Sequence, residues 1–166
     1  MSAITDLHAL RDRLKPSARM PVVFLGHGSP MNAIEDTAYN RAWTDLGKSL
    51  PEPAAILVVS AHWMTRGTTL VDVSNLPKTI HDFYGFPDAL YAMDYPAPGN
   101  PALAREVVSL LASHHAAEDD TWGLDHGAWT VLRFLYPQAK VPVFQVSIDM
   151  ARGLDHQLEV GRTLSQ

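Results

Sequence analysis

Two histidines follow apolar runs at corresponding places in the sequence. His27 comes directly after the run 21–26, and His62 comes directly after the run 54–61. Short apolar runs rich in β-branched residues are typical of strands buried on both faces. Neighbouring parallel strands end at one edge of a sheet, ~4.8 Å apart, so two imidazoles there can bind one metal ion. Either histidine alone is better explained as a hydrogen-bonded residue at a strand end, but two at corresponding positions make His27 and His62 equally good candidates for metal ligands.

Two further histidines lie in segments suited to chemistry. His126 precedes a predicted helix and follows Asp125, which could serve simply as the N-cap of that helix. A histidine near a metal suits proton transfer, because its free pKa is ~6.5. His81 lies in the irregular segment 74–100, whose dense aromatic residues predict either a satellite core or the wall of a pocket for a flat aromatic ligand. The remaining histidines lie in helical or polar contexts and are expected at the surface: His8, His114, His115 and His156.

Composition excludes several classes of function. The 166 residues carry a net charge of −5 and no basic run, which argues against nucleic acid as a partner. Cysteine is absent, so disulfides, thiolate metal sites and iron–sulfur clusters are excluded and any metal must have nitrogen and oxygen ligands. The longest apolar run is far shorter than the ~18 residues of a membrane span. Residues 1–20 contain no apolar stretch typical of a secretory signal, so we expect a cytoplasmic protein that does not associate with membranes.

The elements that must position these histidines alternate along the chain. After an N-terminal arm or short helix over 1–20, apolar runs predict strands at 21–26, 54–61 and 141–147, and alternation of polar and apolar residues predicts a strand at 68–73. Helical spacing and capping residues predict helices at 34–50, from Asn100 to about 111, at 127–135 and from 154. This order predicts a single α/β domain over 1–166, a layered fold with a mostly parallel central sheet and helices on its faces. Ligands of such sheets bind beyond the carboxyl ends of the strands.

Five blocks of sequence follow one another between residues 21 and 149. They read FLGHGSPMNAIEDTAYNRAW, LVVSAHW, TIHDFYGFPDALYAMDYPAPGNP, GLDHGAWTVL and VPVFQVSID. With these blocks the chain resembles the class III extradiol ring-cleavage dioxygenases, and within them the 4,5-DOPA dioxygenase-like branch. No single block is specific, but five in the same order are.

The resemblance implies metal-dependent cleavage of a catechol-type, DOPA-like ring by O2. It implies that His27 and His62 are metal ligands and that His126 is the acid/base that handles the catechol and oxygen protons. It also implies a substrate pocket lined by the HDFYGFP block and the GHGSP turn, with these residues as candidates: Ser29, His81, Tyr84 and Phe86. The implied cofactor is Fe(II) for turnover, with Zn(II), which has no redox chemistry, able to bind in the same site. The implied partners are a small aromatic diol and O2, with a homo-oligomer left open.

One part of the family pattern has no counterpart. The family supplies a further histidine ligand in a glycine-rich strand end, G-S-G-N-x-x-H-N, and the only histidine here after His126 is His156. We therefore expect the domain to be C-terminally incomplete, with the third metal ligand beyond residue 166. On this interpretation the site is weak or empty unless Asp149, a water or another chain completes it.

Two alternatives stay open. A small tetrapyrrole metal chelatase shares the GHGS start and suits the length, but it leaves His62 and the FYGFP and DHGAW blocks unexplained. A catalytically inactive metal-binding fragment also fits the histidines. Insertion of cobalt or nickel into a porphyrin precursor distinguishes the first alternative, and ring cleavage by the iron-loaded protein distinguishes the second.

Overall fold

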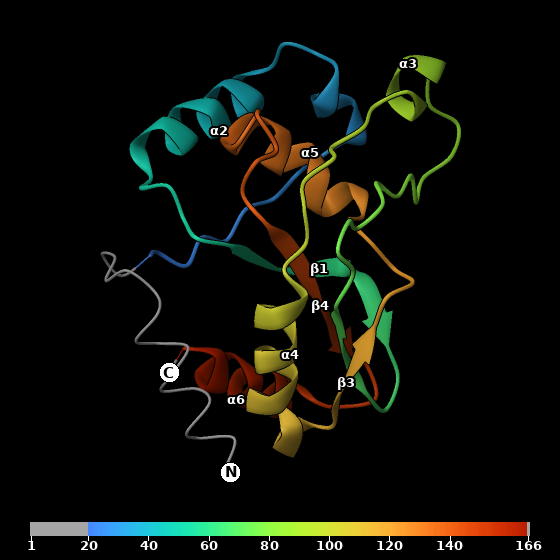
Figure 1. Ribbon diagram of the computed structural model, residues 1–166. Coiled ribbons are helices and arrows are strands. Elements are labelled where there is room, and N and C mark those ends of the chain that lie inside the picture. Colours follow the sequence, from blue (N-terminus) through green and yellow to red (C-terminus); the bar gives the residue numbers. More distant parts are fainter. Residues whose placement is uncertain (1–19, 166) are drawn as a thin grey trace.

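The computed structural model describes residues 20–165, and the predicted arm or helix over 1–20 lies outside the described residues except for Met20. A four-stranded sheet forms the centre of the molecule, in the order β1-β4-β2-β3 (Figure 1). Its strands are β1 (Ile56–Thr65), β2 (Thr69–Asp72), β3 (Ala116–Asp119) and β4 (Val143–Asp149). β1 and β4 are parallel, β2 and β3 are parallel, and β2 and β4 are antiparallel. The sheet is therefore mixed but mostly parallel, which confirms the predicted α/β class.

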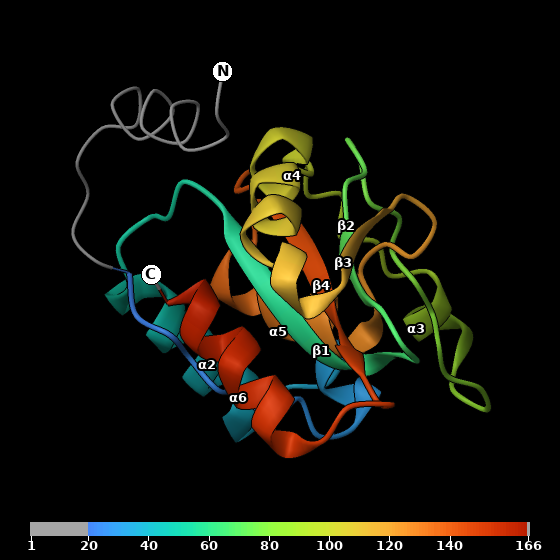
Figure 2. The same cartoon turned by 90° about the horizontal axis from the view of Figure 1, so that it is seen from below.

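Helices cover both faces of the sheet (Figures 1 and 2). α2 (Ala38–Ser49) and α5 (His126–Leu135) lie on one face, and α4 (Pro101–Leu110) and α6 (Leu154–Leu164) lie on the other. Three short elements complete the set: η1 (Pro30–Ala33), α3 (Asp88–Tyr91) and η2 (Ala112–His114). Each face has its own apolar core, one around Trp129 of α5 and one around Phe144 of β4. Among the described residues, no helix has the length and apolar character needed to cross a membrane.

Two of the predicted helix starts are confirmed by their caps. The Asn100 side chain accepts a hydrogen bond from the backbone N–H of Leu103, 3.1 Å away, at the start of α4. The Asp125 side chain accepts from the backbone N–H of Gly127 and of Ala128 at the start of α5. Such side-chain acceptors satisfy N–H groups that have no partner within the helix. They also determine where His126 lies, because it is the first residue of α5.

The predicted strand at 21–26 is wrong. This segment forms no strand and pairs with no part of the sheet, and the side chains of Val22 and Phe24 are each 99% exposed. A strand needs a partner for its backbone hydrogen bonds, and within the described residues β1 pairs with β4 and not with this segment. Sequence also did not predict β3, because the four residues AAED have neither an apolar run nor a period of two.

The predicted C-terminal helix is confirmed as α6, and its one histidine, His156, is not at the surface. His156 is half-buried, and its buried Nε2 has no hydrogen-bond partner in the part of the chain that the structure describes. Its ring lies 5.4 Å from that of His114, which is half-buried as well, whereas His115 is exposed as expected. His8 lies outside the described residues.

Candidate metal centre

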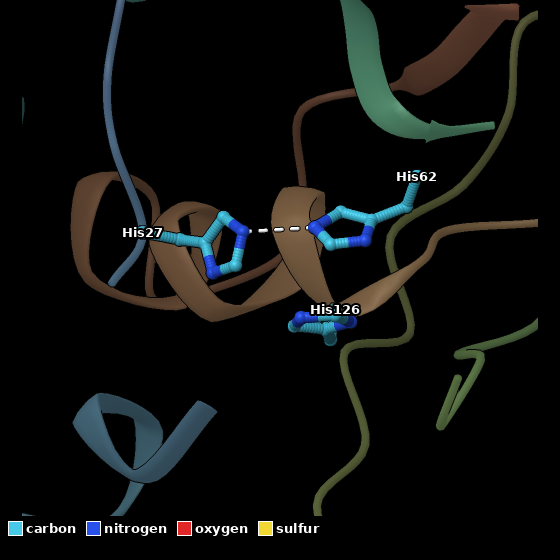
Figure 3. Close-up of side chains that lie close together, drawn as sticks. All are labelled: His27, His62 and His126. Carbon is cyan, nitrogen blue, oxygen red and sulfur yellow. Dashed lines mark hydrogen bonds between the residues drawn. The ribbon is translucent and has the colours of Figure 1, made fainter. Parts of the chain in front are cut away.

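Three histidines from separate parts of the chain lie close together, with their rings facing one another (Figure 3). One nitrogen each of His27, His62 and His126 lies within 4.8 Å of the other two. The Nε2 atoms of His27 and His62 are only 2.8 Å apart, and the rings of His62 and His126 are 4.1 Å apart between centroids. Among the histidine, aspartate and glutamate side chains of the described residues, these three histidines are the group with the spacing needed to hold a metal ion.

His27 reaches the cluster from a loop and not from a strand end. Its backbone carbonyl accepts a hydrogen bond from Asn32 Nδ2, 3.0 Å away, and Asn32 is buried within η1. Ser29 accepts a hydrogen bond from the backbone N–H of Met31 and so caps η1. Gly28 has φ +62°, a left-handed conformation that favours glycine. The turn between His27 and η1 therefore sets the direction of the His27 side chain.

His62 lies in an irregular stretch of β1. The register between β1 and β4 shifts between Val59 and Met64, so His62 lies outside the regular ladder. Ser60 anchors this stretch: its hydroxyl accepts from the backbone N–H of His62 and donates to Asp125 Oδ1, 2.8 Å away. Irregularities of this kind redirect a side chain at a strand end.

His126 is the most enclosed of the three histidines, at 6% exposure. Its backbone N–H and its Nδ1 both lie 2.9 Å from Asp82 Oδ1. The next residue, Gly127, leaves the space that His62 occupies: a Cβ at position 127 would lie 2.6 Å from His62 Cδ2. Helix α5 therefore contributes the imidazole of His126 to the cluster, and Gly127 leaves the space for the imidazole of His62.

The surroundings of His27 favour its neutral imidazole. Burial lowers the pKa of His27, and the neighbouring His126 and His62 lower it further. The Nδ1 of His27 is buried and has no hydrogen-bond partner among residues 20–165. Burial alone raises the pKa of Asp82, but the hydrogen bonds from His126 outweigh it, and the pKa is lowered. Neutral imidazoles bind metal ions, so three convergent nitrogens fit a divalent transition metal ion.

The predicted substrate residues make different contacts. The Nε2 of His81 donates to the carbonyl of Met93 at 2.9 Å, so this nitrogen is bound to the backbone. Tyr84 is 92% exposed, and Ser29 caps η1. Phe86 packs edge-on against Phe83, with 5.3 Å between ring centroids.

Three residues of the site were not predicted from the sequence. Phe83 packs edge-on against His126, 5.5 Å between centroids, and is the aromatic residue that contacts the cluster directly. Asp82 and Gly127 are the other two. The signal for Asp82 and Phe83 was their place within the HDFYGFP block. Asp149, considered as a completing ligand, lies elsewhere and accepts hydrogen bonds from the backbone N–H of Gly67 and Ala151.

Comparisons with known proteins agree with this architecture. Residues 21–166 match the family model described as the catalytic LigB subunit of aromatic ring-opening dioxygenase. The chain is 53% identical over 157 residues to a protein of Escherichia coli K12 named 4,5-DOPA dioxygenase extradiol, and 39% identical over 148 residues to a protein of that name from Beta vulgaris. These alignments include 94% and 86% of this chain.

A solved structure is also similar. The crystal structure of an uncharacterized protein from Escherichia coli K12 superposes with a TM-score of 0.72 at 47% identity, over 89% of this chain and 55% of that one. The chain spans 58% and 55% of the length of the two named relatives. Because the family model matches nearly the whole described sequence, the chain belongs to the LigB family of aromatic ring-opening dioxygenases.

Proposed function

We propose that this chain takes part in the metal-dependent extradiol cleavage of a catechol-type ring by O2. The observation that carries the proposal is the cluster of three histidine nitrogens within 4.8 Å in a chain of the LigB family. Two relatives carry the name 4,5-DOPA dioxygenase extradiol, which supports a DOPA-like diol as the substrate class. We propose Fe(II) as the metal for turnover, with Zn(II) able to bind the same nitrogens.

His27 and His62 are assigned as metal ligands. Their Nε2 atoms face each other at 2.8 Å, and the backbone of each residue is held by a side chain outside the cluster, that of Asn32 for His27 and that of Ser60 for His62. When bound, a divalent iron supplies the Lewis acidity and the redox capacity that ring cleavage by O2 requires. The further ligand expected beyond residue 166 stays a prediction.

His126 is assigned as the acid/base. Its Nδ1 donates to Asp82 Oδ1 at 2.9 Å, which leaves the Nε2 lone pair available to accept a proton from a diol hydroxyl. His126 lies in edge-on contact with Phe83. A flat ring held against this aromatic side would bring its hydroxyl groups toward His126.

The aromatic residues around Phe83 are assigned to substrate binding. Phe86 and Tyr91 both pack against Phe83, at 5.3 and 5.2 Å between ring centroids. His81 holds this group in place through its hydrogen bond to Met93. We assign Tyr84, which is exposed, and Ser29, next to the His27 turn, to the outer part of the pocket.

Anaerobic loading with Fe(II), followed by DOPA and air, tests the proposal. We expect oxygen uptake and a yellow semialdehyde product. His27→Ala and His62→Ala should each abolish stoichiometric metal binding, whereas the exposed His115→Ala should bind as the wild type does. His126→Phe should keep the metal and lose ring opening. Metal retained by both ligand variants, or unchanged turnover in His126→Phe, contradicts these assignments.

The comparisons do not favour the tetrapyrrole chelatase, because the matched family and the named relatives are dioxygenases. Incubation with a porphyrin precursor and cobalt serves as the control, and we expect no metal insertion. A cytoplasmic location and a homo-oligomer are also proposals. Fractionation of cells and sedimentation of the purified chain test them.

A further inference from the structure

The loop before Asp82 is held firmly against helix α5. The backbone N–H of Ile80 donates to the carbonyl of Leu124 at 2.7 Å, and the N–H of Leu124 donates to the carbonyl of Lys78 at 2.8 Å. The indole N–H of Trp129 in α5 donates to the carbonyl of Ile80 at 2.8 Å. Asp82 follows two residues after this anchor, so its position relative to α5 is defined by backbone and side-chain contacts on both sides.

The two carboxylate oxygens of Asp82 face two different histidines of the cluster. Oδ1 lies 2.9 Å from His126 Nδ1, and Oδ2 lies 3.6 Å from His62 Nδ1. The first distance is a hydrogen bond in which Nδ1–H donates to the carboxylate. The second is too long for a hydrogen bond, but the negative charge still favours a proton on the near nitrogen of His62. In both rings Nε2 then keeps its lone pair.

The contact between His62 and His27 fits this arrangement. Two nitrogens 2.8 Å apart share a hydrogen bond only if one carries the proton and the other does not. With the proton of His62 on Nδ1, His62 Nε2 is the acceptor and His27 Nε2–H is the donor. In this tautomer the buried His27 Nδ1, which has no partner among the described residues, carries no proton.

We propose that Asp82 is a positioning residue that selects the Nδ1–H tautomer of both His126 and His62 and so turns their Nε2 lone pairs into the cluster. A carboxylate behind a histidine commonly sets its tautomer and raises its strength as a ligand or base. Here one carboxylate serves two histidines with different roles. The metal-binding consequence rests on the proposed function, but the tautomers themselves can be measured without any metal.

A purely structural role is the competing explanation. Asp82 Oδ1 also accepts from the backbone N–H of His126, the first residue of α5, and could serve only to cap this helix. Asp125 already accepts from the next two backbone N–H groups, of Gly127 and Ala128. The two roles differ in what they change: a cap affects the melting temperature alone, whereas a positioning role affects the histidine tautomers and the metal affinity.

Long-range 1H–15N NMR of the metal-free chain, labelled in histidine and recorded where the imidazoles are neutral, measures the tautomers directly. We expect Nδ1–H in both His126 and His62 of the wild type and a majority of Nε2–H in both rings of Asp82→Ala. Asp82→Asn keeps a carbonyl acceptor for His126 but loses the charge beside His62, so mainly His62 should change. Asp88→Asn is the matched control, because Asp88 is an exposed carboxylate of the same irregular segment. The tautomers of His126 and His62 in Asp88→Asn should match those of the wild type.

Titration with Co(II) in competition with a chelator gives the second readout. We expect Asp82→Ala to bind ~10–100-fold more weakly, the usual effect of removing a partner behind a ligand, and Asp88→Asn to bind as the wild type does. Tautomers that do not respond to Asp82→Ala or Asp82→Asn overturn the inference, even if melting falls. A wild-type chain that binds no Co(II) contradicts the proposed metal centre instead, and the NMR result then decides the role of Asp82 alone.

Discussion

Gly127→Ala should separate the metal site from the stability of the fold. Gly127 is the second residue of α5 and has ordinary helical geometry, so alanine itself causes no backbone strain there. A Cβ at this position would lie 2.6 Å from His62 Cδ2 and 3.1 Å from His62 Nε2. Carbon atoms in contact are normally ~3.5–4.0 Å apart, so the imidazole of His62 must move by about 1 Å.

The two effects of this substitution have opposite signs. Alanine is favoured over glycine in a helix by up to ~1 kcal/mol, which offsets part of the cost of the clash in the folded state. Ligand geometry tolerates displacements of only ~0.5 Å, so a shift of the His62 ring should weaken metal binding by at least about tenfold. Tenfold in affinity corresponds to about 1.4 kcal/mol. We therefore expect the free energy of metal binding to weaken by more than the free energy of unfolding decreases.

Chelator competition with Co(II), together with thermal unfolding of the metal-free chain, measures both quantities on one protein. Gly161→Ala is the matched control, because it also lies within a helix and a Cβ there meets nothing within 4 Å. It should gain helix stability and leave metal affinity unchanged. Wild-type affinity in Gly127→Ala would refute the placement of His62 Nε2 beside this glycine, and with it the assignment of His62 as a ligand.

Three other changes test the packing of the fold. Gly47→Ala brings a Cβ to 2.3 Å from the backbone oxygen of Leu135, so α2 and α5 must separate; urea unfolding should show a loss of about 1–3 kcal/mol. Burial lowers the pKa of His156 below its ordinary 6.5, so the unfolded chain binds this proton more tightly and the free energy of unfolding should fall as the pH drops below about 6.5. Urea unfolding measured at several pH values between 5 and 8, a range that includes the ordinary histidine pKa of ~6.5, should show that the free energy of unfolding depends less on pH in His156→Gln than in the wild type. Trp129→Phe removes the hydrogen bond to the carbonyl of Ile80 and should cost about 1–2 kcal/mol by the same measurement.

Local signals in the sequence were sufficient for most elements that carry the site. The segments around Ile56–Thr65 and before Asp149 are rich in apolar and β-branched residues, and they form the parallel strands β1 and β4 of the central sheet. Asp125 marks the start of α5 because a carboxylate at this position accepts backbone N–H groups whatever the rest of the fold does. Such signals depend on a few neighbouring residues, so they predict strands and helix starts without any knowledge of tertiary contacts.

The contacts that complete the site have no local signal. Asp82 and His126 are 44 residues apart in the chain, and their hydrogen bond depends on the loop that Trp129 and Leu124 anchor. The place of Phe83 against His126 follows from the same anchor. A block such as HDFYGFP indicates that a segment is dense in functional side chains, but only the packed structure shows which of them face the histidines.

His27 lies in the histidine cluster although the strand that was predicted to carry it does not form. An apolar run indicates that burial of its side chains is favourable, but it contains no information on which surface buries them. In this structure Phe24 is fully exposed. His27 nevertheless reaches His62, because η1 and not a strand determines its position. Ala33 of η1 is 2% exposed and lies in the same core as Trp129 of α5, while Asn32 holds the His27 carbonyl. The three-histidine cluster therefore depends on the packing of η1 against α5, and disrupting that contact should displace His27 even with the sheet intact.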